Sequence, residues 1–335
     1  MRKALIPAAA LLAASGMAQA QVSVYGLVDA SYGKSLFTSV FTNEKADFHS
    51  GGDNGNSEGN STTRIGLKGS TDLGSGIKAN FRFESNGITS DGDVNNPTLG
   101  RQAWLGFSGS FGEVRLGRQD SVSFQTMIDY DFNGASNGVS ALGYSFVGPW
   151  LPGRQSRSLQ YISPNFGGVT AQVGFVPEGN RGAPGNAAKN VFSLGVKYTG
   201  GPISGAVSAQ TKDLENSKGF WSLGGSYDLG VVKLSAGYAD GGKFAEGGTG
   251  KGPSLGVVAP VQGFNIGAHV GRNTDDNMKI TSVELFVNRE IFKNTIAYAE
   301  FGDWKSDATG AASLRTVTGA KDKGRGAAVG VIYVF

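Results

Sequence analysis

Residues 77–84 read Ile-Lys-Ala-Asn-Phe-Arg-Phe-Glu, and residues 169–175 read Val-Thr-Ala-Gln-Val-Gly-Phe. In both stretches every second side chain is apolar and the side chains between are polar or small. Residues 192–198 and 264–270 repeat this pattern. Because successive side chains of a β-strand point to opposite faces, each stretch predicts a strand with one apolar and one polar face.

The composition also favours strands over helices. The chain has 335 residues with 54 glycines, no cysteine and only 17% charged residues. Glycine destabilises a helix interior by about 1 kcal/mol relative to alanine, so long helices are not expected. The 20 phenylalanines and 10 tyrosines argue against disorder. The absence of cysteine excludes disulfides, a thiol nucleophile and thiolate metal sites.

The connections between the expected strands alternate between tight turns and long polar loops. Counting both kinds gives about sixteen strands, and an even number of two-faced strands with short connections at one end is typical of an outer-membrane barrel. A soluble β-sandwich and a soluble closed barrel share the alternation, but a barrel of about sixteen strands is too wide for side chains to fill. The apolar faces must then point outward to lipid. We predict an all-β fold, a 16-stranded antiparallel transmembrane β-barrel.

The first twenty residues have the features of a secretory signal peptide. Arg2 and Lys3 precede an apolar run, and Ala18-Gln19-Ala20 is a small-residue cleavage site. Cleavage before Gln21 would leave residues 21–335 as one barrel domain, with 28 basic and 27 acidic residues, a balance of 28 − 27 = +1. This balance gives no support for a nucleic-acid partner.

Several motifs resemble the Gram-negative trimeric porins, and specifically the β-proteobacterial type. The resemblance spans the mature chain, and its motifs are residues 22–30 (Val-Ser-Val-Tyr-Gly-Leu-Val-Asp-Ala), 63–69 (Thr-Arg-Ile-Gly-Leu-Lys-Gly), 72–79 (Asp-Leu-Gly-Ser-Gly-Ile-Lys-Ala), 101–107 (Arg-Gln-Ala-Trp-Leu-Gly-Phe), 111–118 (Phe-Gly-Glu-Val-Arg-Leu-Gly-Arg) and 158–166 (Ser-Leu-Gln-Tyr-Ile-Ser-Pro-Asn-Phe).

The resemblance implies a homotrimer in the bacterial outer membrane, in contact with lipid and lipopolysaccharide. It implies a water-filled channel for passive diffusion of small anionic or neutral solutes. The third loop, here about residues 120–153, would fold inward and narrow the pore. The terminal Phe335 would be the signal read by the barrel-assembly machinery.

Basic side chains on the polar faces predict where the pore narrows. Arg64 and Arg82 each lie about six residues from the same turn, which would place them at similar heights on adjacent strands. Arg101 has an ambiguous phase and is placed in the lumen by the resemblance. The family also implies a basic residue after the third loop, and Arg154 and Arg157 both remain open, since asparagine is commoner at the second position.

The acidic groups expected to face these basic side chains across the pore are the third-loop residues Asp120, Asp129 and Asp131. Since basic groups outnumber them, we expect a preference for anions. Further lumen residues are expected at Lys68, Lys78, Arg115 and Arg118.

Two other functions are alternatives to a general diffusion channel: a substrate-specific channel for sugars or organic acids, and a barrel hydrolase. Gly55-Asn56-Ser57-Glu58-Gly59 has the G-x-S-x-G spacing of a hydrolase but lies in a polar loop. His49 and His269 are the only histidines, and neither has a second ligand at metal spacing. We therefore expect no catalytic residue, metal or cofactor. One irregularity is the last strand, whose polar face carries Ile332 and Val334, which we expect to pack near the periplasmic rim.

Overall fold

The computed structural model describes residues 21–42, 44–86, 88–90, 100–144, 153–179, 182–183, 185–243, 249–275, 278–308 and 321–335. The expected signal peptide, residues 1–20, lies outside the described residues. No helix in these ranges is long and apolar enough to cross a bilayer.

The strands form a closed antiparallel barrel. The described part of the chain has a 17-stranded sheet, and apart from the short β2 (Asp47–Ser50) its sixteen strands close into a ring. This confirms the predicted fold class. The sixteen are β1 (Gln21–Lys34), β3 (Arg64–Gly74), β4 (Ile77–Ser85), β5 (Gln102–Gly109), β6 (Gly112–Asp120), β7 (Arg154–Ile162), β8 (Val169–Val176), β11 (Val191–Gly200), β12 (Ile203–Gln210), β13 (Phe220–Asp228), β14 (Lys233–Asp240), β15 (Lys251–Val261), β16 (Phe264–Asp275), β17 (Met278–Phe292), β18 (Thr295–Ala308) and β19 (Lys323–Val334).

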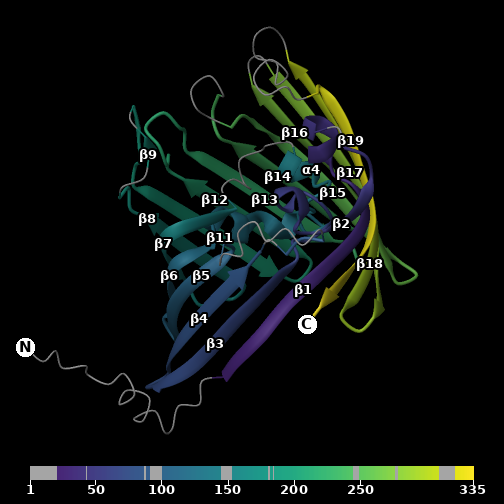
Figure 1. Ribbon diagram of the computed structural model, residues 1–335. Coiled ribbons are helices and arrows are strands. Elements are labelled where there is room, and N and C mark those ends of the chain that lie inside the picture. Colours follow the sequence, from purple (N-terminus) through teal and green to yellow (C-terminus); the bar gives the residue numbers. More distant parts are fainter. Residues whose placement is uncertain are drawn as a thin grey trace, which may run out of the picture.

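The first strand closes the ring by pairing with two partners. Residues 21–27 of β1 pair with β3, whereas residues 27–34 pair with the last strand, β19. Figure 1 shows β1 in purple beside β19 in yellow. The backbone of Phe335 extends the closure, since its N–H donates to the Gly26 carbonyl at 3.1 Å and its carbonyl accepts from the Gly26 N–H at 3.0 Å.

The two faces of the wall differ as the alternation predicts. On β11, Phe192 and Leu194 are 56% and 51% exposed on the outside, whereas Ser193 between them is 4% exposed. At the inner face of β19, Ile332 packs with Leu27 and Tyr298, so this apolar position has neighbours on adjoining strands. An outward apolar surface of this kind requires lipid around it, because water would not stabilise it.

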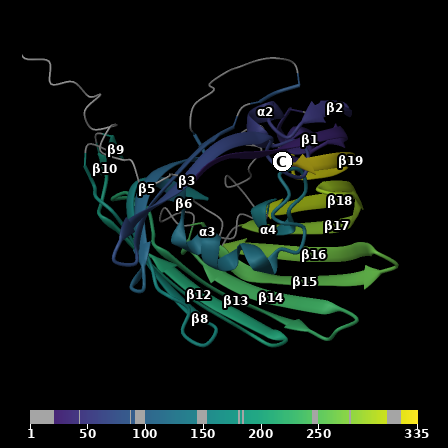
Figure 2. The ribbon, with the colours of Figure 1, turned by 90° about the horizontal axis from the view of Figure 1, so that it is seen from below.

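The third loop runs inside the barrel, between β6 and β7. Figure 2 shows its helices α3 (Val122–Met127) and α4 (Ala141–Tyr144) within the ring of strands. Ser121 caps α3 by accepting a hydrogen bond from the Phe124 N–H at 3.1 Å. The wall facing α3 has glycine where a side chain would collide: a Cβ at Gly195 would lie 2.5 Å from Thr126 Oγ1.

Short connections lie at one end of the barrel and long ones at the other. Two residues join β5 to β6, whereas the first loop, between β1 and β3, has structure of its own. The small elements of the long loops are η1 (Thr38–Thr42) and α2 (Asp53–Asn56) in the first loop, η2 (Ile128–Tyr130) in the third, and β9 (Gly182–Ala183) with β10 (Asn186–Ala187) between β8 and β11.

Candidate functional site: a basic constriction beside the third loop

The third loop is attached to the far wall by two buried carboxylates. Asn133 Nδ2 donates to Glu284 Oε1 at 2.7 Å and to Glu300 Oε2 at 3.1 Å. Ser136 Oγ donates to Glu300 Oε1 at 3.0 Å, and the Ala141 N–H donates to Glu284 Oε2 at 2.9 Å. Because both side chains are buried and every one of their carboxyl oxygens accepts a hydrogen bond from the loop, the loop is held across the lumen.

Apolar packing holds the other half of the loop. Met127, Tyr130 and Leu142 form a buried cluster with Ala206 of the wall. The Tyr130 hydroxyl lies 3.1 Å from Ser204 Oγ. Burial raises the pKa of Tyr130 above its ordinary value, so this hydroxyl stays neutral and can donate a hydrogen bond.

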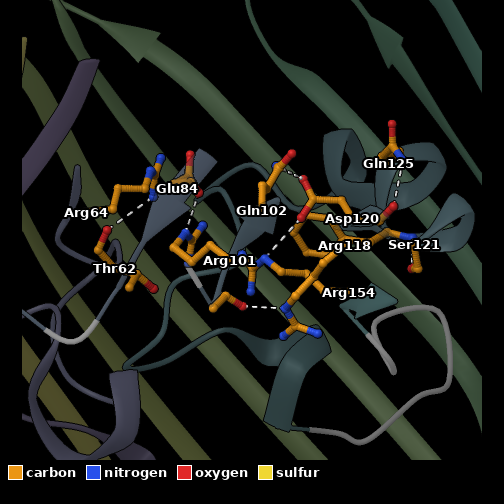
Figure 3. A network of polar contacts seen from close by, with 12 residues as sticks. Thr62, Arg64, Glu84, Arg101, Gln102, Arg118, Asp120, Ser121, Gln125 and Arg154 are labelled. Carbon is orange, nitrogen blue, oxygen red and sulfur yellow. Dashed lines mark hydrogen bonds and ion pairs between the residues drawn. The ribbon is translucent and has the colours of Figure 1, made fainter. Parts of the chain in front are cut away.

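A cavity of about 490 Å³ lies between the third loop and the wall of β3 to β7. Phe124 and Ile128 of the loop form one side of it. Its charged lining consists of the four arginines Arg64, Arg82, Arg101 and Arg154 and the two carboxylates Glu84 and Asp120. Figure 3 shows Arg101 between Glu84 and the pair formed by Asp120 and Arg154.

Glu84 holds two of the four arginines, Arg82 and Arg101. Its side chain is 1% exposed, and Arg101 Nε donates to it at 2.5 Å while Arg82 Nη2 donates at 2.8 Å. The Tyr25 hydroxyl also donates to Glu84, at 2.8 Å, and itself accepts from Arg82 Nε at 2.5 Å. These bonds fix both guanidinium groups in position at the cavity wall.

Asp120, where the third loop begins, holds a third arginine, Arg154. It forms an ion pair with Arg154 Nε at 3.2 Å and accepts a hydrogen bond from Gln102 Nε2 at 3.0 Å. Arg64 differs from the other three arginines, because its Nη1 donates to the Thr62 carbonyl at 3.2 Å and it has no carboxylate within ion-pair distance in the described part of the chain. Its charge is therefore the least compensated of the four.

The lining carries a net positive charge. Four arginines and two carboxylates give 4 − 2 = +2. In a narrow opening with low-dielectric walls, this charge attracts anions and repels cations.

The register corrects the predicted heights of the arginines. Arg82 pairs directly with Lys68, and Arg64 lies above it, beyond the pair of Ile65 and Ser85. The prediction of similar heights was wrong because β3 continues through Thr71 to Gly74 with a bulge, so the turn comes later than the sequence indicated. Both side chains reach the same cavity despite the different heights.

Arg154 and Arg157, the two candidates for the basic pore residue after the third loop, lie in different places. Arg154 lines the cavity, whereas Arg157 is exposed in a β-bulge with a φ of 56°. Arg118 was expected in the lumen. It pairs with Ala103, which lies between the inward-facing Gln102 and Trp104, so the side chain of Arg118 leaves the backbone on the outer face of the wall. It donates to the Gly100 carbonyl and to Ser156 Oγ instead.

Two of the three expected loop acids lie elsewhere. Asp131 is 3% exposed and accepts from Ser140 Oγ at 2.8 Å and from the Asn133 N–H at 3.0 Å, so it holds the loop's own structure. Asp129 forms an ion pair with Lys197 of β11, a residue that the sequence did not single out. Only Asp120 of the three lines the cavity.

A second cavity of about 580 Å³ continues the basic lining towards the short turns. Lys68, Arg82 and Arg115 line it, with Glu113 as the carboxylate partner of Arg115 at 2.6 Å. Lys78 is exposed on the same inward phase as Arg82, four residues closer to the turn. Arg82 thus belongs to both cavities and joins them into one basic path.

Glu84 and Tyr25 are the functional groups that sequence reasoning missed. Glu84 lies two residues after Arg82 on the same polar phase, so the pattern contained its inward orientation but not its partners. Among the described residues there is no group of three histidine or acidic side chains that could hold a metal ion. Ser57 of the G-x-S-x-G stretch follows the short α2 in the first loop, not a strand-to-helix elbow.

Comparisons with known proteins agree with this geometry. The family model described as Gram-negative porin matches residues 8–309. Outer membrane porin protein 32 of Delftia acidovorans is 35% identical over 252 residues, which cover 70% of this chain and 68% of that protein. The chain belongs to the Gram-negative porin family.

Solved porin structures share the fold. The anion-selective porin from Comamonas acidovorans aligns with a TM-score of 0.74 and 25% identity, covering 95% of this chain and 100% of that one. The trimer form of OmpT from Vibrio cholerae aligns with a TM-score of 0.63 at 14% identity, covering 94% and 99%. The chain is therefore an outer-membrane porin, a channel across the bacterial outer membrane.

Proposed function

We propose that this porin passes small hydrophilic solutes by passive diffusion with a preference for anions, and that Arg64, Arg82, Arg101 and Arg154 form its selective constriction with Glu84 and Asp120. The observation that carries the proposal is the net charge of +2 on the cavity lining beside the third loop. The resemblance to an anion-selective porin supports it.

The proposal is tested by the reversal potential of the refolded mature chain in a planar bilayer with a tenfold gradient of KCl. A channel governed by this lining shifts the reversal potential towards the chloride equilibrium potential. A shift towards the potassium potential would overturn the assignment of the constriction while leaving the channel itself intact.

We also propose a homotrimer in which the C-terminal strand is read by the barrel-assembly machinery. The fold is shared with OmpT in its trimer form, and the exposed ring of Phe335 stacks with Tyr333 at 6.3 Å at the edge of β19. Replacing Phe335 with alanine should lower the yield of assembled protein in the outer membrane. The trimer is checked by cross-linking of the purified protein, which should give a three-chain species.

A further inference from the structure

The first loop, which connects β1 to β3, folds into the barrel like the third loop. At its start, Leu36 and Val40 are 0% and 2% exposed and pack with Ile280 and Trp304 of the inner wall. The wall leaves room for them, since a Cβ at Gly324 would lie 2.5 Å from Val40 Cγ2. The start of the first loop is therefore packed against the inside of the barrel.

A buried carboxylate of the wall holds the end of the first loop. Asp29 of β1 is 0% exposed, and its Oδ2 accepts from the Asn60 N–H at 2.8 Å and from the Ser61 N–H at 2.6 Å. Its Oδ1 accepts from the Tyr298 hydroxyl at 2.8 Å. Because buried polar groups are stable only when they are paired, these bonds fix the backbone of residues 60–61 to the wall.

Backbone hydrogen bonds join the first loop to the third. The Gly138 N–H donates to the Gly59 carbonyl and the Asn137 N–H donates to the Asn60 carbonyl, each at 2.9 Å. In the other direction, the Leu36 N–H donates to the Gly138 carbonyl at 2.8 Å. A Cβ at Gly138 would lie 3.1 Å from the Gly59 carbonyl oxygen, so the two backbones are in close contact here.

The side chain of Asn60 adds bonds at the same junction. Its Nδ2 donates to Asn133 Oδ1 at 3.0 Å and to Glu300 Oε2 at 3.1 Å. Glu300 is one of the two carboxylates that attach the third loop to the far wall. The first loop therefore shares the attachment of the third loop.

Thr62 connects this junction to Arg64 of the constriction. The Thr62 hydroxyl accepts from Asn137 Nδ2 at 3.2 Å, and the Thr62 carbonyl accepts from Arg64 Nη1 at 3.2 Å. Figure 3 shows Thr62 beside Arg64. The other three arginines are held by carboxylates, whereas Arg64 has none within ion-pair distance in the ranges that the structure describes. The position of its guanidinium therefore depends on the Thr62 carbonyl.

The first loop also lines the cavity beside the arginines. Its residues there are uncharged, so they add surface to the ion path and leave the net charge of the lining at +2. These residues are Gly55, Asn56, Asn60, Ser61 and Thr62.

We propose that the first loop is a third wall of the constriction, next to the third loop and the wall of β3 to β7, and that Thr62 is a positioning residue. Held by Asn137 of the third loop, Thr62 sets where the charge of Arg64 lies in the ion path. The inference rests on the proposed function, because it takes Arg64 as part of the selective constriction.

The positioning role is tested with Thr62→Val, which removes the hydroxyl and keeps both the shape and the carbonyl. We expect the chloride-to-potassium permeability ratio to fall about twofold, as it would if the Arg64 charge moved from about 6 Å to about 10 Å from the passing ion. Thr62→Ser keeps the hydroxyl and should keep the ratio. Thr42→Val makes the same chemical change at an exposed position of the first loop outside both cavities, and should also keep it.

The Arg64→Gln background shows whether Thr62 acts through Arg64. Arg64→Gln alone should lower the permeability ratio about threefold, and adding Thr62→Val should then have no further effect. An unchanged ratio in Thr62→Val, or an equal fall in the presence and absence of Arg64, would overturn the positioning role. If Arg64→Gln itself left the ratio unchanged, the proposed constriction would be wrong.

The wall is tested by chemical labelling, since the chain has no cysteine of its own. Ser61→Cys is treated in the open channel with an anionic or a cationic thiosulfonate reagent, and Thr42→Cys is the control. At position 61 the anionic label should lower the permeability ratio about threefold and the cationic label should raise it by the same factor, whereas neither label should change it at position 42.

Failure of Ser61→Cys to react, or an unchanged ratio after labelling confirmed by mass, would show that the first loop does not line the ion path. Heat-dependent gel mobility reports whether each variant forms the closed barrel.

Discussion

Reversing two charges of the constriction should reverse the ion preference. In the double variant Arg64→Glu and Arg82→Glu, two arginines and four carboxylates line the cavity, so the net charge changes from +2 to 2 − 4 = −2. Glu84 would then lose one of its two arginine partners but keep Arg101. The barrel wall itself should persist, because both positions face the cavity rather than the lipid.

The size of the effect follows from Coulomb's law. A unit charge about 6 Å from a passing ion contributes about 0.7 kcal/mol in water, and screening at about 0.1 M salt reduces this to about 0.4 kcal/mol. Four units of charge therefore destabilise the anion by about 1.5 kcal/mol and stabilise the cation by the same amount. The difference of about 3 kcal/mol corresponds to a change of about 100-fold in relative permeability.

The reversal potential in a tenfold KCl gradient measures this change. The unchanged protein should lie on the chloride side of zero and the double variant on the potassium side. Lys212→Glu with Lys293→Glu is the matched control, because it makes the same change in total charge at exposed positions away from the cavity. If the double variant kept the selectivity of the unchanged protein, Arg64 and Arg82 would not form the constriction.

Three further variants test single contacts. Glu84→Gln raises the net charge of the lining to +3 and should increase the chloride-to-potassium permeability ratio about threefold, measured from the reversal potential. Arg154→Gln should lower that ratio by a similar factor while Arg157→Gln leaves it unchanged, and equal effects would place both residues in the pore. Asn133→Ala removes the bonds to both buried carboxylates of the far wall and should destabilise the third loop by about 2 kcal/mol, seen as added current noise and a lower Tm. A quiet channel with an unchanged Tm would show that the Asn133 bonds are not needed to hold the loop.

The fold could be predicted because its physics is local. Alternation such as that of residues 192–198 fixes which face of a strand meets lipid, and this needs no knowledge of the strand's neighbours. The third loop was predicted with good bounds for the same reason, since β6 ends at Asp120 and β7 begins at Arg154. Turn positions were less reliable, because β3 continues through residues that are typical of turns.

The site depended on information that alternation does not contain. The phase predicts that Arg82 and Glu84 face inward. It does not predict that Arg101, which precedes β5, joins them through its side-chain bond to Glu84. The same phase gave no indication that Asp131 turns away into the loop, because loop residues have no fixed alternation. Pairing across strands, and not the sequence order, determines which charges meet.

The small residues of the inner wall show how the loop and the barrel depend on each other. A barrel of sixteen strands has no need of glycine at its inner face, yet a Cβ at Gly195 or Gly224 would lie within 3 Å of side chains of the third loop. Glycines weaken strands, and these two lie where another segment approaches the wall closely. Composition alone indicated many glycines, whereas the position of the loop explains why they lie here. The cavity that Arg64 and Asp120 line therefore depends on the wall as much as on the loop, since a side chain at either glycine would collide with the third loop.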